Sequence, residues 1–218
     1  MIRPNGATGG LFPEPADVPG QCGLERSRKL GDSKQSVRQV VRQRLASLSS
    51  EQRNARSSLI CGRLRQLEFV EQAEQLVLYS ALADEVDLQD LTAGMRGDRP
   101  RLYLPVSDRD SPRFRRWRPG EPVESGAFGA LEPLSGEEPV PGAKVVLVPG
   151  RAFDSAGRRL GRGTGWYDRA LAALGTSAFR LGVAFSCQLF EQVPVAHHDL
   201  GVDYLVTEDR VIDCRRDR

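Results

Sequence analysis

A glycine-rich stretch is the part of the sequence best suited to chemistry. It runs Arg159-Leu-Gly-Arg-Gly-Thr-Gly-Trp-Tyr-Asp168, with glycines alternating at positions 161, 163 and 165. Glycine lets the backbone adopt positive φ and approach a ligand closely. Successive N–H groups ahead of a helix N-terminus form an anion site, and Arg159 and Arg162 add forked donors for phosphate or carboxylate oxygens. The stretch therefore predicts a phosphate-binding loop.

Asp168 closes this stretch, in the first turn of a helix expected at about 166–174. A carboxylate there could hold Mg²⁺ on bound phosphates, since hard cations take oxygen ligands. The alternative is a flexible surface loop in which Asp168 only caps the helix. The stretch is neither standard nucleotide loop, because the chain has no Gly-Lys pair and Trp166 stands where a dinucleotide fingerprint needs glycine.

The elements that must position this loop are short apolar strands alternating with helices. The clearest buried strand is Lys144–Pro149 (KVVLVP), directly before the loop. Strands are also expected at 76–80, 101–105, 114–117, 180–184 and 203–206, a helix near 88–95, and a long loop at 119–143. This alternation predicts an α/β fold: one three-layer domain whose mostly parallel sheet has helices on both faces.

Two helices are expected before the first strand. Ser33 can cap the first, which begins at Lys34 and has an apolar face made of Val37, Val40, Val41, Leu45 and Leu48. Ser49 or Ser50 can cap the second, whose apolar stripe is read as Ala55, Leu59, Ile60, Leu64 and Leu67.

The domain organisation follows from length and composition. The chain has 218 residues, which suits one α/β domain with a tail. Residues 1–33 contain six glycines and four prolines and show no periodicity, so we expect a flexible N-terminal extension. The domain would then span 34–212, followed by a charged C-terminal tail at 213–218.

The charge balance is nearly even but locally segregated. Lys+Arg 31 against Asp+Glu 29 gives a net charge of +2, which argues against a strongly basic nucleic-acid binder and an acidic disordered chain. Residues 34–66 hold eight bases and one acid, and residues 67–100 hold eight acids and two bases. This pattern leaves room for a small polyanion in a local basic pocket.

Cysteine and histidine usage argues against a zinc or redox site. The four cysteines lie far apart without a C-x-x-C pair, and the only histidines are the adjacent His197 and His198, which rarely converge on one ion. The chain shows neither an apolar run of membrane-span length nor the apolar core of a secretory signal. We therefore expect a cytoplasmic protein with reduced thiols and no membrane partner.

Six short motifs, found in one order along the chain, together resemble those of a known protein family. They are KQSVR at 34–38, EVD at 85–87, GALEP at 129–133, PGRAFD at 149–154, the loop at 159–168, and VPVAHHD at 193–199 followed by VDY. The chain resembles the 5-formyltetrahydrofolate cyclo-ligase (5,10-methenyltetrahydrofolate synthetase) family over about residues 34–208. The resemblance implies that ATP and Mg²⁺ drive conversion of 5-formyltetrahydrofolate to 5,10-methenyltetrahydrofolate, with phosphorylation of the formyl oxygen and release of ADP and phosphate.

The resemblance also assigns roles to residues. The ATP site would be Lys34, Arg38, Arg159, Leu160, Gly161, Arg162, Gly163, Thr164, Gly165, Trp166 and Tyr167. The folate would contact Leu82, Glu85, Arg162, Trp166 and Tyr167; Arg162 would be catalytic; and Asp168 and Asp199 would hold Mg²⁺. The partners implied are ATP and 5-formyltetrahydrofolate. Separately from the resemblance, we expect a monomer with room for a polyglutamate tail on the folate.

Each assignment has a plainer alternative. Lys34 and Arg38 could be a solvated pair on a helix face, Glu85 a helix-start carboxylate, and Asp199 a turn residue. Asp87 is a secondary candidate, and the aromatic residues Phe114, Trp117 and Phe128 could stack on the folate but more often belong to a core. At the level of function, the alternatives are a non-catalytic folate- or nucleotide-binding protein and an RNA-binding protein using the basic helices.

Overall fold

The computed structural model describes residues 33–95, 97, 99–106, 112–126, 129–142, 144–175, 177–196 and 199–216. The expected N-terminal extension, apart from Ser33, lies outside these residues, as do Phe128, His197 and His198. Within the described part of the chain, no helix is long and apolar enough to cross a membrane.

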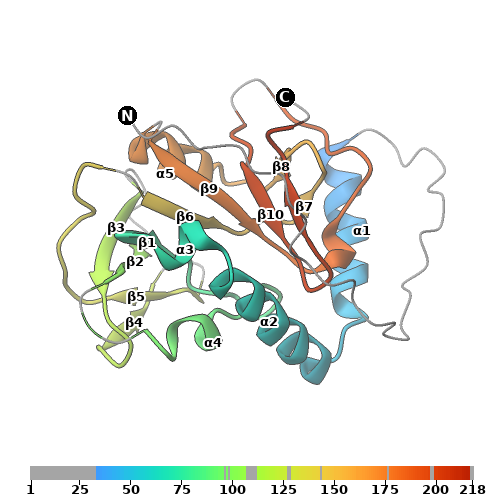
Figure 1. Ribbon diagram of the computed structural model, residues 1–218. Helices are drawn as coiled ribbons and strands as arrows, with labels where there is room; N and C mark the ends of the chain where they lie inside the picture. Colours follow the sequence, from blue (N-terminus) through green and yellow to red (C-terminus); the bar gives the residue numbers. More distant parts are fainter. Residues whose placement is uncertain are drawn as a thin grey trace.

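A seven-stranded sheet forms the centre of the molecule, in the order β11-β10-β9-β6-β1-β2-β3 (Figure 1). The five inner strands pair in parallel and the two edge strands pair antiparallel. This confirms the predicted mostly parallel sheet. The parallel strands are β1 (Gln75–Val77), β2 (Arg101–Val106), β6 (Lys144–Val148), β9 (Ala178–Val183) and β10 (Tyr204–Val206); the edges are β3 (Arg113–Trp117) and β11 (Val211–Asp213).

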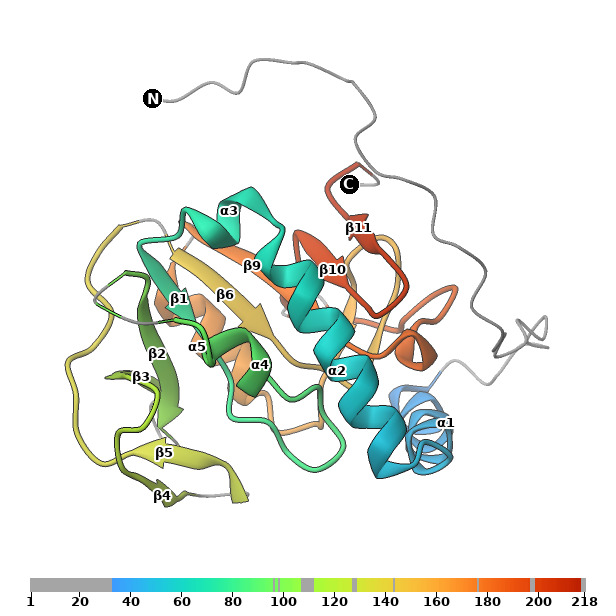
Figure 2. The ribbon, with the colours of Figure 1, turned by 60° about the horizontal axis from the view of Figure 1, so that its bottom comes forward.

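Helices cover both faces of this sheet (Figure 2). Side chains alternate between the faces of a strand: Leu147 of β6 packs in the core cluster of Ile60, whereas Val146 and Val148 pack in the cluster of Leu171. The fold is therefore the predicted three-layer α/β arrangement. One face carries α2 (Ser50–Arg65), α3 (Glu68–Glu71) and α4 (Gln89–Thr92), and the other carries α5 (Trp166–Leu174).

The helix α1 (Lys34–Ala46) begins where the sequence predicts. The Ser33 hydroxyl accepts a hydrogen bond from the backbone N–H of Ser36 at 3.2 Å and caps the helix. Its apolar stripe packs into the core, with Val37, Val41, Leu45 and Leu48 buried and Val40 half-buried.

The helix α2 has the predicted start but a different buried face. Ser49 and Gln52 form a capping box. Ala55 and Leu59 are exposed, the latter by 58%, so their place in the apolar stripe was wrong. The buried face runs through Ser57, Ile60, Cys61 and Leu64. It includes polar groups because the Ser57 hydroxyl accepts from the N–H of Asp87 at 3.1 Å and the Cys61 thiol donates to the carbonyl of Asp87 at 3.3 Å.

Several short elements escaped sequence reasoning. The expected loop at 119–143 contains an antiparallel hairpin of β4 (Val123–Ser125) and β5 (Leu131–Pro133), so a continuous loop there was wrong. A second hairpin joins β7 (Ala152–Phe153) to β8 (Arg159–Leu160), and a 3₁₀ turn, η2, covers Ser186–Gln188. Strands and turns of two or three residues are too short to display a period.

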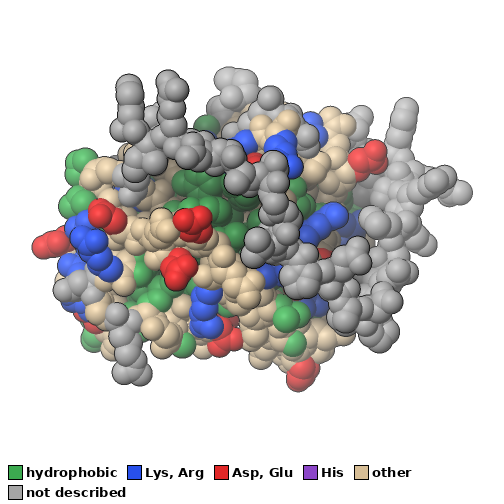
Figure 3. All heavy atoms as spheres, in the orientation of Figure 1, with side chains coloured by type: hydrophobic (Ala, Val, Ile, Leu, Met, Phe, Trp, Pro, Cys, Tyr) green, Lys and Arg blue, Asp and Glu red, His purple; other side chains and the backbone are tan. Residues whose placement is uncertain are grey.

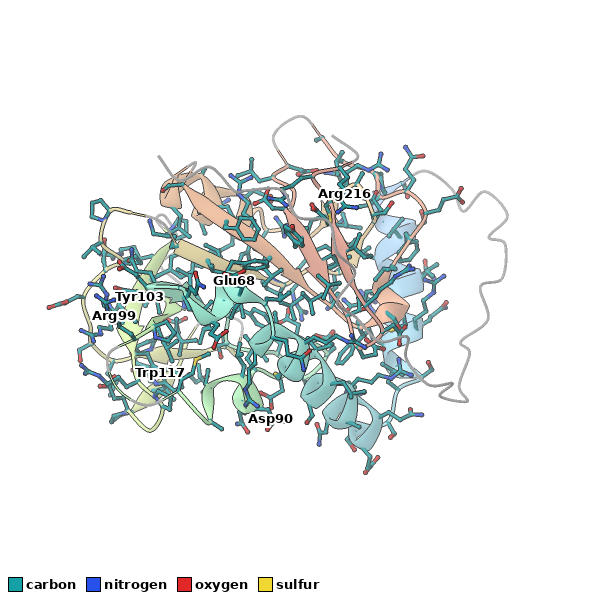
Figure 4. The ribbon with its side chains drawn as sticks, in the orientation of Figure 1. Glu68, Asp90, Arg99, Tyr103, Trp117 and Arg216 are labelled. Atoms are coloured by element: carbon teal, nitrogen blue, oxygen red, sulfur yellow. The ribbon has the colours of Figure 1, made fainter. Side chains whose placement is uncertain are left out.

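The observed bounds of several elements also differ from those expected from the sequence. The strand expected at 76–80 is β1 at 75–77, and the helix expected at 88–95 is the single turn α4. Asp90 of α4 accepts a hydrogen bond from Ser58 of α2, and Asp90 is labelled on α4 in Figure 4. At the C-terminal end β11 runs to Asp213 and Cys214 is fully buried, past the boundary suggested at residue 212.

Candidate active site

A cavity of about 900 Å³ lies where the parallel strands end. Ser80 follows β1, Pro105 lies near the end of β2, and Pro149 and Gly150 follow β6. The crevice at the carboxyl ends of parallel strands is where α/β sheets bind ligands. The fold therefore provides a binding site at the end of the sheet that carries the glycine-rich loop.

Apart from the secondary candidate Asp87 and the aromatic candidates, every site residue predicted from the sequence lines this one cavity. The set comes from four separate parts of the chain: Lys34 and Arg38 on α1; Leu82 and Glu85 after β1; the whole stretch from Arg159 to Asp168; and Asp199. Sequence reasoning gave no role to other lining residues. Nothing in the types or spacing of Ser80, Pro105, Arg169 and Leu200 singled them out, whereas Ala130 and Gly150 belong to two of the resembling motifs but were not assigned to the site.

The aromatic candidates separate in the structure. Trp117 is labelled in Figure 4 and lies on β3, where its indole N–H donates to the carbonyl of Glu121 at 3.3 Å. It is not among the residues that line the cavity. Phe114 is buried, with its ring 5.8 Å edge-on to that of Trp166. Phe114 thus supports a cavity wall from behind.

The glycine-rich loop takes its shape from glycine conformations and from α1. Gly163 and Gly165 have positive φ, +110° and +65°, and Gly165 is the N-cap of α5. Such φ values strain any residue with a Cβ. The Nε of Arg38 donates to the carbonyl of Gly161 at 2.9 Å. Arg38 is therefore tied to the loop, and it is more than a solvated surface residue.

Arg159 is held inside the wall of the cavity. It lies on β8, is 4% exposed, and places Nη2 2.5 Å from Oδ1 of Asp168. The same Asp168 oxygen accepts from the N–H of Leu200 at 3.2 Å. Arg159 is thus a buried partner of Asp168 and braces the loop. Of the phosphate or carboxylate oxygens suggested from the sequence, its guanidinium contacts a carboxylate.

Arg162 projects from the loop toward the residues that follow β1. Its Nε and Nη2 lie 3.1 and 2.9 Å from Oε1 of Glu85, and Nη2 also contacts Asp84. Burial tends to lower the pKa of Arg162, but Glu85 and Asp84 outweigh that effect and raise it. The other Glu85 oxygen accepts from the N–H of Leu82 at 3.1 Å, which fixes the carboxylate in place.

On another side of the cavity, the start of α1 meets a segment near the C-terminal end of the domain. Lys34 forms an ion pair with Asp199, and Oδ2 of Asp199 also accepts from the N–H of Ala196 at 2.7 Å. Leu200, next to Asp199, donates to Asp168. The two predicted metal ligands are therefore linked through the backbone at one corner of the cavity.

The donor set fits a cation that is shared with phosphates. Within the described residues, no group of three or more His, Cys, Asp or Glu side chains could hold a metal. Asp168 and Asp199 are two carboxylates lining the cavity, and Mg²⁺ commonly binds through one or two carboxylates together with waters and substrate phosphates. The residues fit Mg²⁺ in that form.

Charge and burial favour an anionic ligand with an aromatic part. The cavity lining has five bases (Lys34, Arg38, Arg159, Arg162, Arg169) against three acids (Glu85, Asp168, Asp199), a balance of +2. Burial and the nearby Glu85 hold the pKa of the Tyr167 phenol well above its usual value. Trp166 lies edge-on to Tyr167, with ring centroids 4.9 Å apart. The site thus combines cationic donors with neutral aromatic surface.

Comparison with known proteins gives a consistent result. Residues 31–208 match the model of the 5-formyltetrahydrofolate cyclo-ligase family. A Haemophilus influenzae 5-formyltetrahydrofolate cyclo-ligase is 29% identical over 181 residues, covering 79% of this chain and 97% of the relative. A Mycolicibacterium smegmatis protein of the same name is 34% identical over 125 residues, covering 53% and 64%. The solution structure of Aquifex aeolicus 5,10-methenyltetrahydrofolate synthetase is similar with a TM-score of 0.73 and 35% identity, covering 84% of this chain and 93% of that one.

Proposed function

This chain belongs to the 5-formyltetrahydrofolate cyclo-ligase family, and we propose that it converts 5-formyltetrahydrofolate to 5,10-methenyltetrahydrofolate with ATP and Mg²⁺, releasing ADP and phosphate. The observation that carries the proposal is the convergence of four chain segments on one cavity. That cavity has a basic glycine loop on one wall and the Glu85 carboxylate on another, as an ATP and folate site would require.

The proposed reaction needs activation of a poor electrophile. A formyl group on nitrogen resembles an amide, and its oxygen is a poor leaving group. Transfer of the γ-phosphoryl group of ATP to that oxygen releases ADP and corrects both defects. The N10 amine then attacks the formyl carbon and loses its proton, and phosphate departs as the C–O bond breaks. For such a reaction a protein must mainly position the reactants and stabilise charge. A nucleophilic triad is not needed.

The triphosphate would be held by the basic wall of the cavity. Lys34 and Arg38 approach it from α1, and the N–H groups of residues 161–165 approach it from the loop. Asp168 and Asp199 would hold Mg²⁺, which when bound offsets the negative charge of the phosphates. Arg159 would act indirectly, because its ion pair with Asp168 fixes that carboxylate.

The folate would lie beside Arg162 and the residues after β1. Glu85 would accept hydrogen bonds from the N–H edge of the pterin, with Leu82, Trp166 and Tyr167 as apolar surface beside it. Arg162 would stabilise the charge that develops on the transferred phosphoryl group. It is 35% exposed, so it can reach a ligand from the loop.

A turnover assay tests the proposal. The full chain is mixed with Mg-ATP and 5-formyltetrahydrofolate, and the methenyl product is followed by its near-ultraviolet absorbance together with release of ADP and phosphate. We expect one ADP for each product molecule and no product without Mg²⁺. Binding of both ligands without turnover would instead indicate a non-catalytic folate- and nucleotide-binding protein.

The RNA-binding alternative has less support. On the face seen in Figure 3, acidic and basic side chains are interspersed, with no single large basic patch. A salt-dependent mobility shift with RNA at physiological ionic strength would favour that alternative. We further propose that the domain acts as a cytoplasmic monomer and accepts polyglutamylated folate, which size-exclusion chromatography and a comparison of glutamate chain lengths would test.

A further inference from the structure

Asp84 and Arg151 form a chain of ion pairs with two site residues. Nη1 of Arg151 contacts one carboxylate oxygen of Asp84, and the other oxygen contacts Nη2 of Arg162. Arg162 in turn contacts Glu85. The order Arg151, Asp84, Arg162, Glu85 thus alternates positive and negative charge. The first two residues do not line the cavity.

Arg151 is a firmly held end of this chain of charges. Its backbone N–H donates to the carbonyl of Leu160 at 2.7 Å, and its own carbonyl accepts from Nε2 of Gln188 at 3.1 Å. Its side chain is only 17% exposed. Asp84 lies within a turn closed by the N–H of Glu85 donating to the carbonyl of Leu82 at 2.9 Å. Both residues are therefore supported independently of any ligand.

The proposed function gives Glu85 to the folate, and a carboxylate engaged with a pterin cannot hold Arg162 equally well. Asp84 can hold Arg162 in place while Glu85 contacts the folate. We propose that Asp84, braced by Arg151, is a positioning residue that keeps the Arg162 guanidinium in the cavity while Glu85 binds the folate. The inference rests on the proposed function, since it assumes that Arg162 acts on the reacting groups.

Charge and donor geometry support this role. Burial tends to raise the pKa of Asp84, but hydrogen bonds from Arg151 and Arg162 outweigh burial and hold that pKa below its usual value. Asp84 is therefore charged at neutral pH. Arg162 uses Nε and Nη2 for its carboxylate partners, and Nη1 makes no hydrogen bond to the described residues. Held in this way, Arg162 keeps one donor group for a ligand.

The first test compares Asp84→Asn and Arg151→Gln with a matched control, Arg56→Gln. Arg56 also pairs through Nη1 with a carboxylate, Glu208, at 26% exposure, and neither residue lines the cavity. We expect Asp84→Asn to lower kcat about tenfold and Arg151→Gln about fivefold, with KM for ATP changed less than about threefold, because misplacing a catalytic group affects the transition state most. The control should leave kcat within about twofold while lowering the melting temperature.

The second test exchanges the charges, combining Asp84→Arg with Arg151→Asp. A simple structural ion pair would be restored by the exchange, and kcat with it. Positioning of Arg162 would not be restored, because residue 84 would then repel it. We expect recovery of the melting temperature without recovery of kcat. We also expect the double variant Asp84→Asn with Arg162→Lys to have a kcat less than about twofold below that of Arg162→Lys alone. The two losses would not add, because Asp84 acts only through Arg162.

The outcomes separate the inference from the function on which it rests. A wild-type chain without turnover would overturn both. An active wild type whose kcat is unchanged in Asp84→Asn, or recovers in the charge exchange, would overturn the inference alone.

Discussion

The side chains of Arg159 and Asp168 close the base of the glycine-rich loop, with Nη2 of Arg159 2.5 Å from Oδ1 of Asp168. The two residues are nine positions apart and mark the ends of the loop. Asp168 therefore has two tasks in the proposed enzyme. It holds the loop closed through Arg159, and it carries one of the two carboxylates proposed for Mg²⁺.

Substitution of Asp168 should separate these tasks. We expect Asp168→Ala to weaken Mg-ATP binding by about tenfold or more, because the Mg²⁺ on the phosphates would lose a carboxylate ligand. Folate binding should weaken by less than about threefold. Isothermal titration of each ligand measures the difference. Asp168→Asn, which keeps an acceptor for the N–H of Leu200, is the control for loop shape. Equal losses for both ligands would mean that Asp168 only holds the loop and helix.

Arg162→Ala should abolish most turnover and leave the fold intact. Loss of one donor that stabilises developing charge commonly costs about 10²- to 10³-fold in kcat. Arg162 is 35% exposed on a surface loop, so its removal opens no cavity in the core. Steady-state kinetics check the loss of turnover, and circular dichroism with thermal melting checks that the fold is intact. A variant with normal kcat would exclude Arg162 from the mechanism.

Lys34→Gln should raise the KM for ATP by about tenfold and change kcat less. The substitution removes a positive charge from the cavity and abolishes the Lys34–Asp199 ion pair, and charged hydrogen bonds of this kind contribute about 1.5–3 kcal/mol. Arg42→Gln is the matched control, because Arg42 lies exposed on the same helix outside the cavity. Equal effects of the two changes on KM would indicate general electrostatics of α1.

The buried face of α2 can be tested by stability. Ile60 is fully buried and Leu59 is 58% exposed. Ile60→Ala should lower the free energy of unfolding by about 2–5 kcal/mol, whereas Leu59→Ala should change it by about 0.5 kcal/mol or less. Urea titrations of both variants give these values. Similar losses at the two positions would support the stripe first read from the sequence.

Cys61 predicts a pH dependence of stability. Burial raises the pKa of the Cys61 thiol from 9.0 to about 11. Between these two values the unfolded chain releases this proton and the folded chain retains it, so stability is complete below about pH 9 and falls as the pH rises toward 11. The limiting slope is about 1.4 kcal/mol per pH unit. Cys61→Ala should show a shallower fall in urea titrations across this range. Identical slopes would contradict the burial of a protonated thiol.

Local pattern was enough to predict some elements and not others. The helix at 166–174 was predicted with its exact bounds because a glycine-rich loop precedes it and Gly175 follows its last residue. Strand β6 was predicted because the sequence KVVLVP contains a continuous apolar run, and all five residues of the strand are buried. The face of α2 was misread because Ser57 and Cys61 are buried through hydrogen bonds to the backbone of Asp87, and an apolar stripe cannot reveal such partners.

The candidate site also has features that the sequence could predict and features that it could not. Residue types, loop spacing and family resemblance sufficed to select residues that line one cavity. The same evidence could not reveal that Arg159 is buried against Asp168, or that Asp84 connects Arg162 to Arg151, which lies 67 positions along the chain from Asp84. These pairings depend on how two loops meet at the end of the sheet, and no local period encodes that meeting.

The ion pair between Lys34 and Asp199 joins positions 165 residues apart, and this has a consequence for biosynthesis. During translation Lys34 leaves the ribosome long before Asp199 has been made. A nascent chain that already contains Lys34 therefore cannot complete the pocket until residue 199 has been added. Stabilisation by the proposed nucleotide is available only after nearly the whole domain has been released.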